Sequence, residues 1–275
     1  MLIFGLPLGI DFKGGALTEV SYATARPDAD LVKSALEKIN VGEPIVQPIG
    51  TDGYAIKTRA LSETERQTVL QTLTLDVKNP AQEKSFTSIG PSVGRELARK
   101  AIISIILVAL GIVCFIAYAF RQVTKPVSSW KYGLIAITTL IHDVLIPVGV
   151  FAALARVYHA EVDTLFVVAI LTILGLSVSD TIVVFDRVRE NVKSGAFKVF
   201  PETVGRSIDQ AFTRSINTSL TVIIALLALF FFGPASTKVF ALMLTAGMFF
   251  GTYSSIFLAS PLLVYVQEWE AKRRK

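Results

Sequence analysis

The chain has 275 residues, of which 52% are hydrophobic and only 18% are charged. A soluble protein of this length carries more charge, so the composition indicates a membrane protein. The net charge of +5 is uneven, because residues 1–94 hold nine basic and eleven acidic residues whereas residues 95–275 hold eighteen and eleven. The basic excess therefore lies in the apolar part, where it is better explained by membrane topology than by nucleic-acid binding. Cys114 is the only cysteine, which excludes an internal disulfide.

Residues 1–94 predict a small soluble α+β domain. Met1–Leu8 is apolar but too short to cross a bilayer. The expected elements are then a glycine-rich turn at Gly9–Gly15, a strand over Ala16–Tyr22, a helix over Asp28–Ile39, strands over Pro44–Ile49 and Tyr54–Arg59, a helix from Ser62 to about Leu75, and a strand over Glu83–Ile89. An Asp-Gly pair predicts a hairpin between the middle strands, and Ser62 with Glu65 predicts a capping box. This β-α-β-β-α-β order is that of the ferredoxin-like split motif.

Residues 95–275 predict an α-helical membrane bundle. Five apolar runs are long enough to span a bilayer, at 101–120, 132–154, 164–185, 215–232 and 239–266. In the last run, Gly247 and Gly251 form a Gly-x-x-x-Gly pattern that is typical of close helix packing. The expected molecule is therefore a five-span bundle that follows a ferredoxin-like domain.

The basic residues between the runs predict the topology. The loops Arg121–Lys131 and Arg187–Arg214 hold three and six basic residues, and the tail Lys272–Lys275 holds four. The alternate loops hold only Arg156 and Lys238. By the positive-inside rule, the basic loops and the C-terminus are cytoplasmic, and five spans then place the N-terminal domain outside the cell.

Within the stretch Gly175–Asn191, Asp180 is the one acid that lies well inside the apolar run. An ionised carboxylate there costs roughly 2.5–3.5 kcal/mol on insertion scales, so it usually has a partner or a function. At helical spacing it shares a face with Ser177, Thr181 and Val184, which makes a polar stripe along an apolar helix. A carboxyl in such a stripe can hold a proton or pair with a base.

Two further spans carry polar stripes. One holds Thr138, Thr139, His142 and Asp143, and the other opens with Arg214, Asn217, Thr218 and Thr221 on one face. Facing stripes of carboxylate, imidazole and hydroxyl groups suit a proton relay. A guanidinium stays charged at any relevant pH, so Arg214 is a candidate counter-charge for Asp180. The candidate proton pathway comprises Asp180, Arg214, Asp143, His142, Thr181 and Asn217.

Structural roles compete with these assignments. Asp180 can be a hydrogen-bonded structural acid, and His142 with Asp143 can join helices through polar contacts. Arg214 can extend to lipid headgroups from the end of its span. The sequence has no zinc-type spacing, Walker loop or nucleophile elbow. We therefore expect neither enzymatic activity, nor a metal, nor a cofactor.

Three segments resemble the SecF family of protein-export membrane proteins, within the resistance–nodulation–division superfamily. Gly9–Gly15 matches the Gly-Ile-Asp-Phe-Lys-Gly-Gly entry to the family's extracytoplasmic domain. Ser177–Asn191 resembles its intramembrane Asp-Thr-(Val/Ile)-Val-Val-Phe-Asp-Arg segment. Arg214–Ser219 resembles its Arg-Ser-x-Asn-Thr-Ser helix start, and His142-Asp143 also fits.

The resemblance implies a function and a set of partners. SecF is the smaller half of the SecD–SecF accessory complex of bacterial and archaeal protein export. In the family, the acid matching Asp180 and the arginine matching Arg214 are implicated in proton passage. The implied protein lies in the cytoplasmic (inner) membrane and uses the proton-motive force for late steps of translocation. Its implied partners are SecD, the SecYEG translocon with SecA, unfolded preproteins and membrane lipids, with no nucleic acid.

Two departures from the family pattern bear on these expectations. Leu176 and Ser179 stand where family members usually have Tyr and Asn, so we expect different hydrogen bonding around Asp180. The family has six spans, the first ahead of the Gly9–Gly15 motif, so we expect a further span upstream of Met1. Two other functions stay open, namely export of small molecules or lipids by a member of the same superfamily, and a passive scaffold whose outer domain binds partners.

Overall fold

The computed structural model describes residues 5–76, 78–121, 127–158, 160–195 and 197–273. The chain forms two compact units. The sheet unit is Leu8–Ile102, and the helical unit is Met1–Pro7 together with Ile103–Lys275. Helix α4, Pro91–Ala119, begins in the first unit and ends in the second, so no break in the chain marks the domain boundary expected after residue 94.

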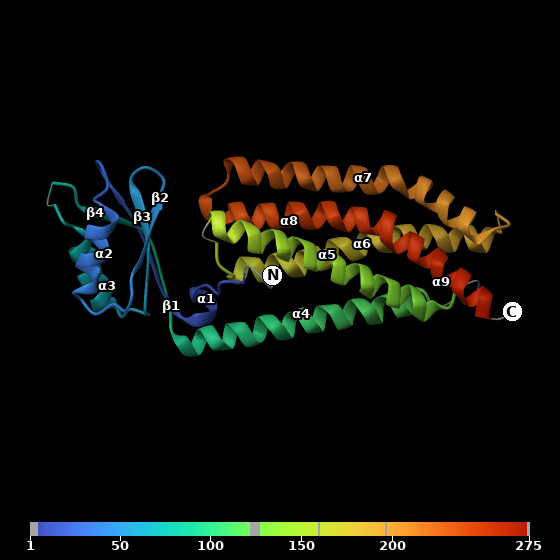
Figure 1. The fold of residues 1–275 in the computed structure, drawn as a ribbon, viewed down its shortest axis with the longest axis horizontal. Coiled ribbons are helices and arrows are strands. Elements are labelled where there is room, and N and C mark those ends of the chain that lie inside the picture. The colour runs from blue at the N-terminus through green and yellow to red at the C-terminus, as the bar shows by residue number, and fades with distance from the viewer. Residues whose placement is uncertain (1–4, 77, 122–126, 159, 196, 274–275) are drawn as a thin grey trace. The chain divides into compact units, whose positions relative to one another are not determined.

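The sheet unit has the element order that the sequence predicts. Its strands are β1 (Gly15–Tyr22), β2 (Ile45–Ile49), β3 (Gly53–Thr58) and β4 (Ala81–Ile89), and its main helices are α2 (Ala29–Glu37) and α3 (Glu63–Leu73). The strands pair antiparallel in the order β2-β3-β1-β4. Both helices cover one face of the sheet (Figure 1). Val20 and Ile56 from the sheet pack there against Val32, Leu36 and Val69 from the helices.

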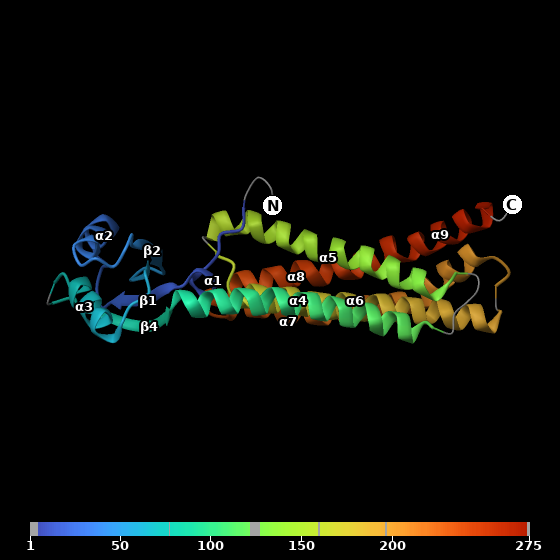
Figure 2. The ribbon, with the colours of Figure 1, turned by 90° about the horizontal axis from the view of Figure 1, so that it is seen from below.

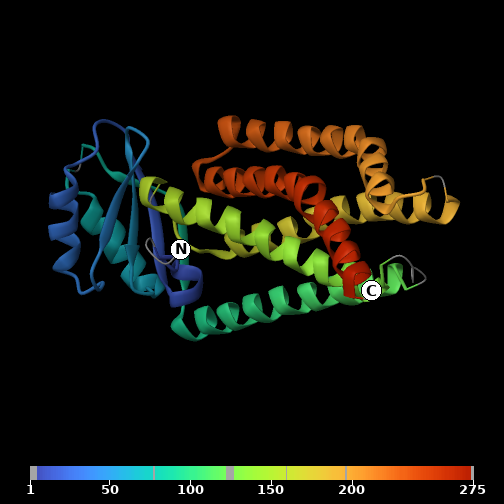
Figure 3. The same ribbon diagram turned by 45° about the vertical axis from the view of Figure 1, so that its right-hand side comes forward.

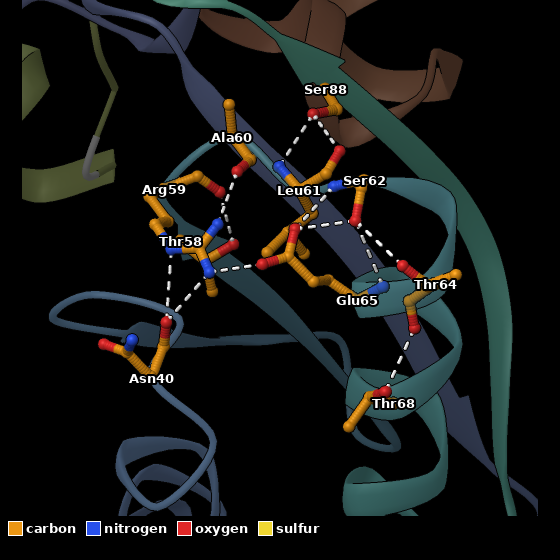
Figure 4. Close-up of polar contacts among 10 residues, drawn as sticks. All are labelled: Asn40, Thr58, Arg59, Ala60, Leu61, Ser62, Thr64, Glu65, Thr68 and Ser88. Atoms are coloured by element: carbon orange, nitrogen blue, oxygen red, sulfur yellow. Dashed lines mark hydrogen bonds and ion pairs between the residues drawn. The ribbon is translucent and has the colours of Figure 1, made fainter.

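The predicted capping box at the start of α3 is confirmed. Ser62 Oγ accepts a hydrogen bond from the Glu65 backbone N–H at 3.4 Å, and the Glu65 carboxylate accepts one from the Ser62 N–H at 2.8 Å. Arg59 pairs with the same carboxylate and also donates to the carbonyl oxygen of Asn40 (Figure 4). The Arg59 guanidinium, with help from Ser62, lowers the pKa of Glu65 to about 2.

The glycine-rich segment before β1 contains a helical turn, α1 (Ile10–Lys13), where the sequence predicts only a turn. Gly14 and Gly15 follow it with φ angles of 80° and 145°, which residues other than glycine rarely adopt. A Cβ on Gly14 would lie 2.8 Å from Pro91 Cα, and one on Gly15 would lie 2.9 Å from the Thr58 carbonyl oxygen. The two glycines therefore let the chain enter β1 in contact with the start of α4.

Among the described residues, five helices are long and apolar enough to cross a membrane. They are α4 (Pro91–Ala119), α5 (Ser129–Tyr158), α6 (Thr164–Ser194), α7 (Phe200–Phe232), and a last span built from α8 (Ala235–Ser254), a π-helical turn (Ser255–Ala259) and α9 (Ser260–Arg273). Asp163 caps the start of α6 by accepting from the Phe166 N–H at 2.8 Å, and the left-handed Gly195 ends it. The five expected spans are therefore confirmed as helices that extend past their apolar cores.

The centre of the helical unit is formed by α5, α6 and α8, while α7 packs against α6 and α8 (Figures 2 and 3). Close packing through the Gly-x-x-x-Gly pattern is confirmed for α6 and α8. A Cβ on Gly247 would lie 2.3 Å from Ile173 Cγ1, and one on Gly251 would lie 3.2 Å from Ser177 Cβ. By contrast, only 6% of the apolar window of α4 and 11% of that of α7 are buried.

Candidate functional site

Two buried carboxyl groups mark the candidate site, at the meeting of α5, α6 and α8. Asp143 of α5 is 0% exposed and Asp180 of α6 is 7% exposed. Each carboxyl group accepts a hydrogen bond from at least one other helix, so each links parts of the chain that are far apart in sequence.

Asp143 has three hydrogen-bonding partners, two of them serine hydroxyl groups from other helices. Its Oδ2 accepts hydrogen bonds from Ser177 Oγ of α6 and from Ser254 Oγ of α8, the latter at 2.7 Å. Its Oδ1 lies 2.8 Å from Nδ1 of its neighbour His142, which is half-buried. Asp143 therefore joins three helices, and its hydrogen-bonding capacity is well used.

Asp180 belongs to a chain of hydroxyl groups. Its Oδ2 accepts from Thr252 Oγ1 of α8 at 2.8 Å, and Thr252 Oγ1 lies 2.5 Å from Ser219 Oγ of α7. Ser219 Oγ also lies 2.7 Å from the carbonyl oxygen of Ser215 in its own helix. A path of polar atoms thus runs from α7 through α8 to the carboxyl group of α6.

The last span is adapted to bring these donors to the two acids. Gly251 lets the backbone of α8 approach Ser177, which places Thr252 and Ser254 within reach of α6 and α5. The π-helical turn follows directly. Directly after it, Ser260 Oγ donates back to the Ser255 carbonyl at 2.9 Å, so a serine hydroxyl satisfies a backbone acceptor of the turn. Single π turns inside α-helices are frequent at functional sites.

The structure brings four of the six predicted site residues together. Asp143, Asp180 and Thr181 are buried at the helix junction, and His142 contacts Asp143. The hydroxyl group of Thr181 donates to the Ser177 carbonyl of its own helix at 3.1 Å, so this bond lies within α6. The acid-bearing stripe of α6 faces inward, as its periodicity predicts.

Arg214 and Asn217 are placed differently from the expectation. Both lie on the exposed side of α7, with Thr218 and Thr221, and Arg214 has no ion pair within the described part of the chain. The side of α7 that faces the bundle carries Ser215 and Ser219 instead. Small side chains at spacing i, i+4 allow α8 to approach closely, whereas Arg214 and Asn217 would hold the two helices apart.

Sequence reasoning missed three residues of the site, which are Ser219, Thr252 and Ser254. A signal for Thr252 and Ser254 exists, because a run of hydroxyl residues follows Gly251 in the middle of an apolar span. Such residues often hydrogen-bond across helices in membranes. For Ser219, the neighbouring polar stripe of Arg214 and Asn217 gave the stronger periodicity, on the other side of α7.

The arrangement suits proton transfer better than metal binding. In the described ranges, no group of three or more His, Cys, Asp or Glu residues is placed to hold a metal ion. A carboxyl group can take up and release a proton, and a hydroxyl group can donate and accept at once, so it can pass a proton on. The geometry therefore offers a titratable acid at the end of a hydroxyl chain.

Comparison with known proteins decides the family. The family model "Protein export membrane protein SecD/SecF, C-terminal" matches residues 69–269, and the "SecD/SecF GG Motif" matches residues 1–25, which include Gly14 and Gly15. The chain belongs to the SecD/SecF family. The resemblance seen in the sequence is thereby confirmed, and the five spanning helices make this SecD/SecF member a multi-pass membrane protein.

Individual relatives agree with this assignment. The chain is 44% identical to the protein translocase subunit SecF of Thermobaculum terrenum, over 99% of this chain and 87% of the relative. It is 37% identical to the subunit of the same name from Anaerolinea thermophila, over 98% and 87%. It also superposes on the crystal structure of SecDF, a translocon-associated membrane protein from Thermus thermophilus, with a TM-score of 0.78, 30% identity and coverage of 97% of this chain and 35% of that one.

Proposed function

We propose that this chain is the SecF subunit of a protein-export complex and that it uses the proton gradient to promote late steps of translocation. Membership of the SecD/SecF family and the relatives named as translocase subunits support the export function. The match to about one third of a SecDF chain supports SecD as the partner. The observation that carries proton use is the chain of hydroxyl groups, Ser219 and Thr252, that ends at the buried carboxyl group of Asp180.

In this proposal, Asp180 changes the contact between α6 and α8 when it takes up a proton. The ionised carboxylate only accepts hydrogen bonds, so Thr252 must donate to it. The protonated carboxyl group can donate instead, so the Thr252 hydroxyl can turn toward another acceptor. The chemistry stays non-enzymatic, because the proton moves between positioned side chains and no covalent bond of a substrate changes.

The proposed setting follows from family and charge. SecD, the SecYEG translocon with SecA, and unfolded preproteins are the proposed partners, in the cytoplasmic (inner) membrane. The basic loops and C-terminus face the cytoplasm, and the sheet unit lies outside it, where a translocating chain emerges. Arg214, on the exposed side of α7, is retained as a proposed pathway residue that acts from outside the bundle core.

The test is export of a reporter preprotein in vesicles with and without a proton gradient. Asp180→Asn should abolish the stimulation by the gradient, because the amide cannot titrate, whereas Asp180→Glu should retain part of it. Arg214→Ala should also abolish it, and His142→Ala should have a milder effect. Each variant should still assemble with SecD.

The matched control is Asp186→Asn, at an exposed position in the same helix. This variant should keep the full response to the gradient. Full stimulation by the Asp180→Asn protein would contradict proton relay and would favour a passive scaffold whose buried acids are structural.

A further inference from the structure

A second site candidate lies at the other end of the last span, outside the acid cluster. The start of α5 and the end of α9 enclose a pocket of about 380 Å³, lined by Trp130, Lys131, Trp269, Glu270 and Arg273. We call it the Trp–Arg pocket. The two helices lie beside each other at this end of the helical unit (Figure 1).

One of the two cations in the pocket is already neutralised. Lys131 is only 8% exposed, and its ammonium group forms an ion pair with the carboxylate of Glu270. This pair ties α9 to α5, and both of its residues line the pocket. Lys131 Nζ also lies 5.4 Å from the centre of the Trp130 ring, so its position is set by both neighbours.

The second cation is available to a ligand. The Arg273 guanidinium stacks on the Trp269 ring, with Cζ 3.9 Å from the ring centre. In the part of the chain that the structure describes, no carboxylate pairs with Arg273. Stacking fixes the plane of the guanidinium and leaves its N–H groups free for a planar or tetrahedral anion. Lys272 adds a further positive charge beside it.

Both tryptophans stay unusually exposed for their size. Trp130 is 63% exposed and Trp269 is 45% exposed. They stand where two spanning helices, 130–157 and 236–273, begin and end. Tryptophan is enriched at this depth of a bilayer, where one side of the ring meets acyl chains and the N–H meets headgroups. The pocket is therefore at headgroup level.

We propose that the Trp–Arg pocket binds the headgroup phosphate of an anionic phospholipid. The phosphate contacts Arg273, the first acyl carbons lie against Trp130 and Trp269, and the Lys131–Glu270 pair forms the inner wall. Negative headgroup charge complements the net positive pocket, and the basic tail places it at the cytoplasmic leaflet, which is rich in anionic lipid. Such a lipid would hold α5 and α9 together.

The experiment measures lipid retention and does not depend on export. The full chain is reconstituted in bilayers of equal parts phosphatidylglycerol and phosphatidylcholine, extracted, and examined by native mass spectrometry. The unchanged protein should retain phosphatidylglycerol in preference to phosphatidylcholine. Arg273→Gln should lower this retention about five- to tenfold, as expected for loss of one headgroup-binding arginine, and Arg273→Lys should restore part of it.

A matched control is available at the end of α4. The Arg121 guanidinium also stacks on an aromatic ring, with Cζ 3.8 Å from the centre of Tyr118, but it does not line the Trp–Arg pocket. Arg121→Gln should leave retention unchanged. Equal losses from the Arg121 and Arg273 variants, or equal retention of both lipids, would overturn the proposal. So would displacement of the lipid by millimolar inorganic phosphate, because the pocket would then be a free-anion site.

Discussion

Thr252 has one hydroxyl hydrogen, and this fixes the direction of the bonds around Asp180. When Thr252 donates to the carboxylate, its contact with Ser219 can be a hydrogen bond only if Ser219 donates. Ser219 then cannot also donate to the Ser215 carbonyl, although that oxygen is 2.7 Å away. A change of protonation at Asp180 therefore changes which acceptor Ser219 serves, two residues away in the chain of contacts.

This leads to a prediction for Thr252→Val, which keeps the shape of the side chain and removes the hydroxyl. The Asp180 carboxyl group loses a buried donor, which costs about 1–3 kcal/mol, and the path to Ser219 is broken. We expect a lower melting temperature of the detergent-solubilised protein and loss of most gradient-driven export.

The control for Thr252 is Thr245→Val in the same helix. Its hydroxyl group donates to the Ala241 carbonyl one turn earlier, at 2.8 Å, so this bond lies within α8. This variant should keep both properties near those of the unchanged protein. If the two valine variants behave alike, the hydroxyl of Thr252 has no special role.

The acids of the site were predictable from sequence, but their partners were not. A carboxyl group inside an apolar run stands out, so Asp180 and Asp143 could be named without a structure. Serine and threonine are common in membrane helices, so Ser219 carries little signal until a neighbouring helix is placed, and the signal of Thr252 is limited to its place directly after Gly251. Periodicity shows that Arg214 belongs to a polar stripe along α7. It does not show whether this stripe faces the other helices or the outside of the bundle, because that depends on how the helices pack.

At the scale of helices, the close contact between α6 and α8 depends on Gly247, which has no side chain. Ile173 fills the space over Gly247, where any Cβ would lie 2.3 Å from Ile173 Cγ1. Since this contact sets the distance between α6 and α8, it also sets the distance between Thr252 and Asp180. The packing position and the polar site are therefore linked through the helix spacing.

Gly247→Ala should therefore destabilise the helical unit by about 1–3 kcal/mol, the usual cost of overpacking, and should weaken gradient-driven export. Thermal unfolding in detergent measures the first effect. Adding Ile173→Ala should recover part of the loss, because it removes the atoms that the new methyl group meets.

Gly175→Ala is the control for Gly247. A Cβ there meets no atom within 4 Å, and alanine favours a helix more than glycine does. Its stability should be unchanged or slightly higher. A Gly247→Ala protein as stable as the control would show that α8 can move away from α6 without cost.

Helix identity was clear from the sequence, while helix ends and irregularities were not. The apolar run 164–185 predicts a span, but α6 continues through the charged residues to Ser194, because a helix needs no membrane to persist once it has begun. Likewise, α1 occupies only four residues between glycines, too few for a periodic signal. The π-helical turn, Ser-Ile-Phe-Leu-Ala, has no sequence signature that sets it apart from the rest of the apolar span.

At the scale of the whole molecule, we expect a fall in pH to lower the stability of the sheet unit through protonation of Glu65. Its pKa is lowered to about 2 in the folded protein by the Arg59 guanidinium and the Ser62 cap, and lies near 4.5 when unperturbed. A lowered folded pKa contributes stability above the unfolded pKa, and this is lost as pH falls from about 4.5 to about 2. Because the pair is exposed, the effect is modest and shrinks with added salt.

Hydrogen exchange of the full chain between pH 5 and pH 2.5 would measure this effect at the amides of α3, after correction for intrinsic rates. Protection should fall with pH in the unchanged protein and should be lower but flatter in Glu65→Gln. Glu37→Gln, at an exposed position of α2, should behave like the unchanged protein. Identical pH profiles for the Glu65→Gln and unchanged proteins would contradict the assignment.

The π-helical turn also determines how the last span tolerates changes in chain length. A π turn accommodates one residue more than an α-helical turn of the same length. The side chains before and after it therefore keep the orientation that they would have in an uninterrupted α-helix one residue shorter. Loss of one residue within Ser255–Ala259 would therefore leave Ser254 facing Asp143 and Glu270 facing Lys131. Loss of one residue elsewhere between these contacts would rotate one end of the span by about 100° relative to the other. Single-residue insertions and deletions in evolution are thus expected to gather at this turn.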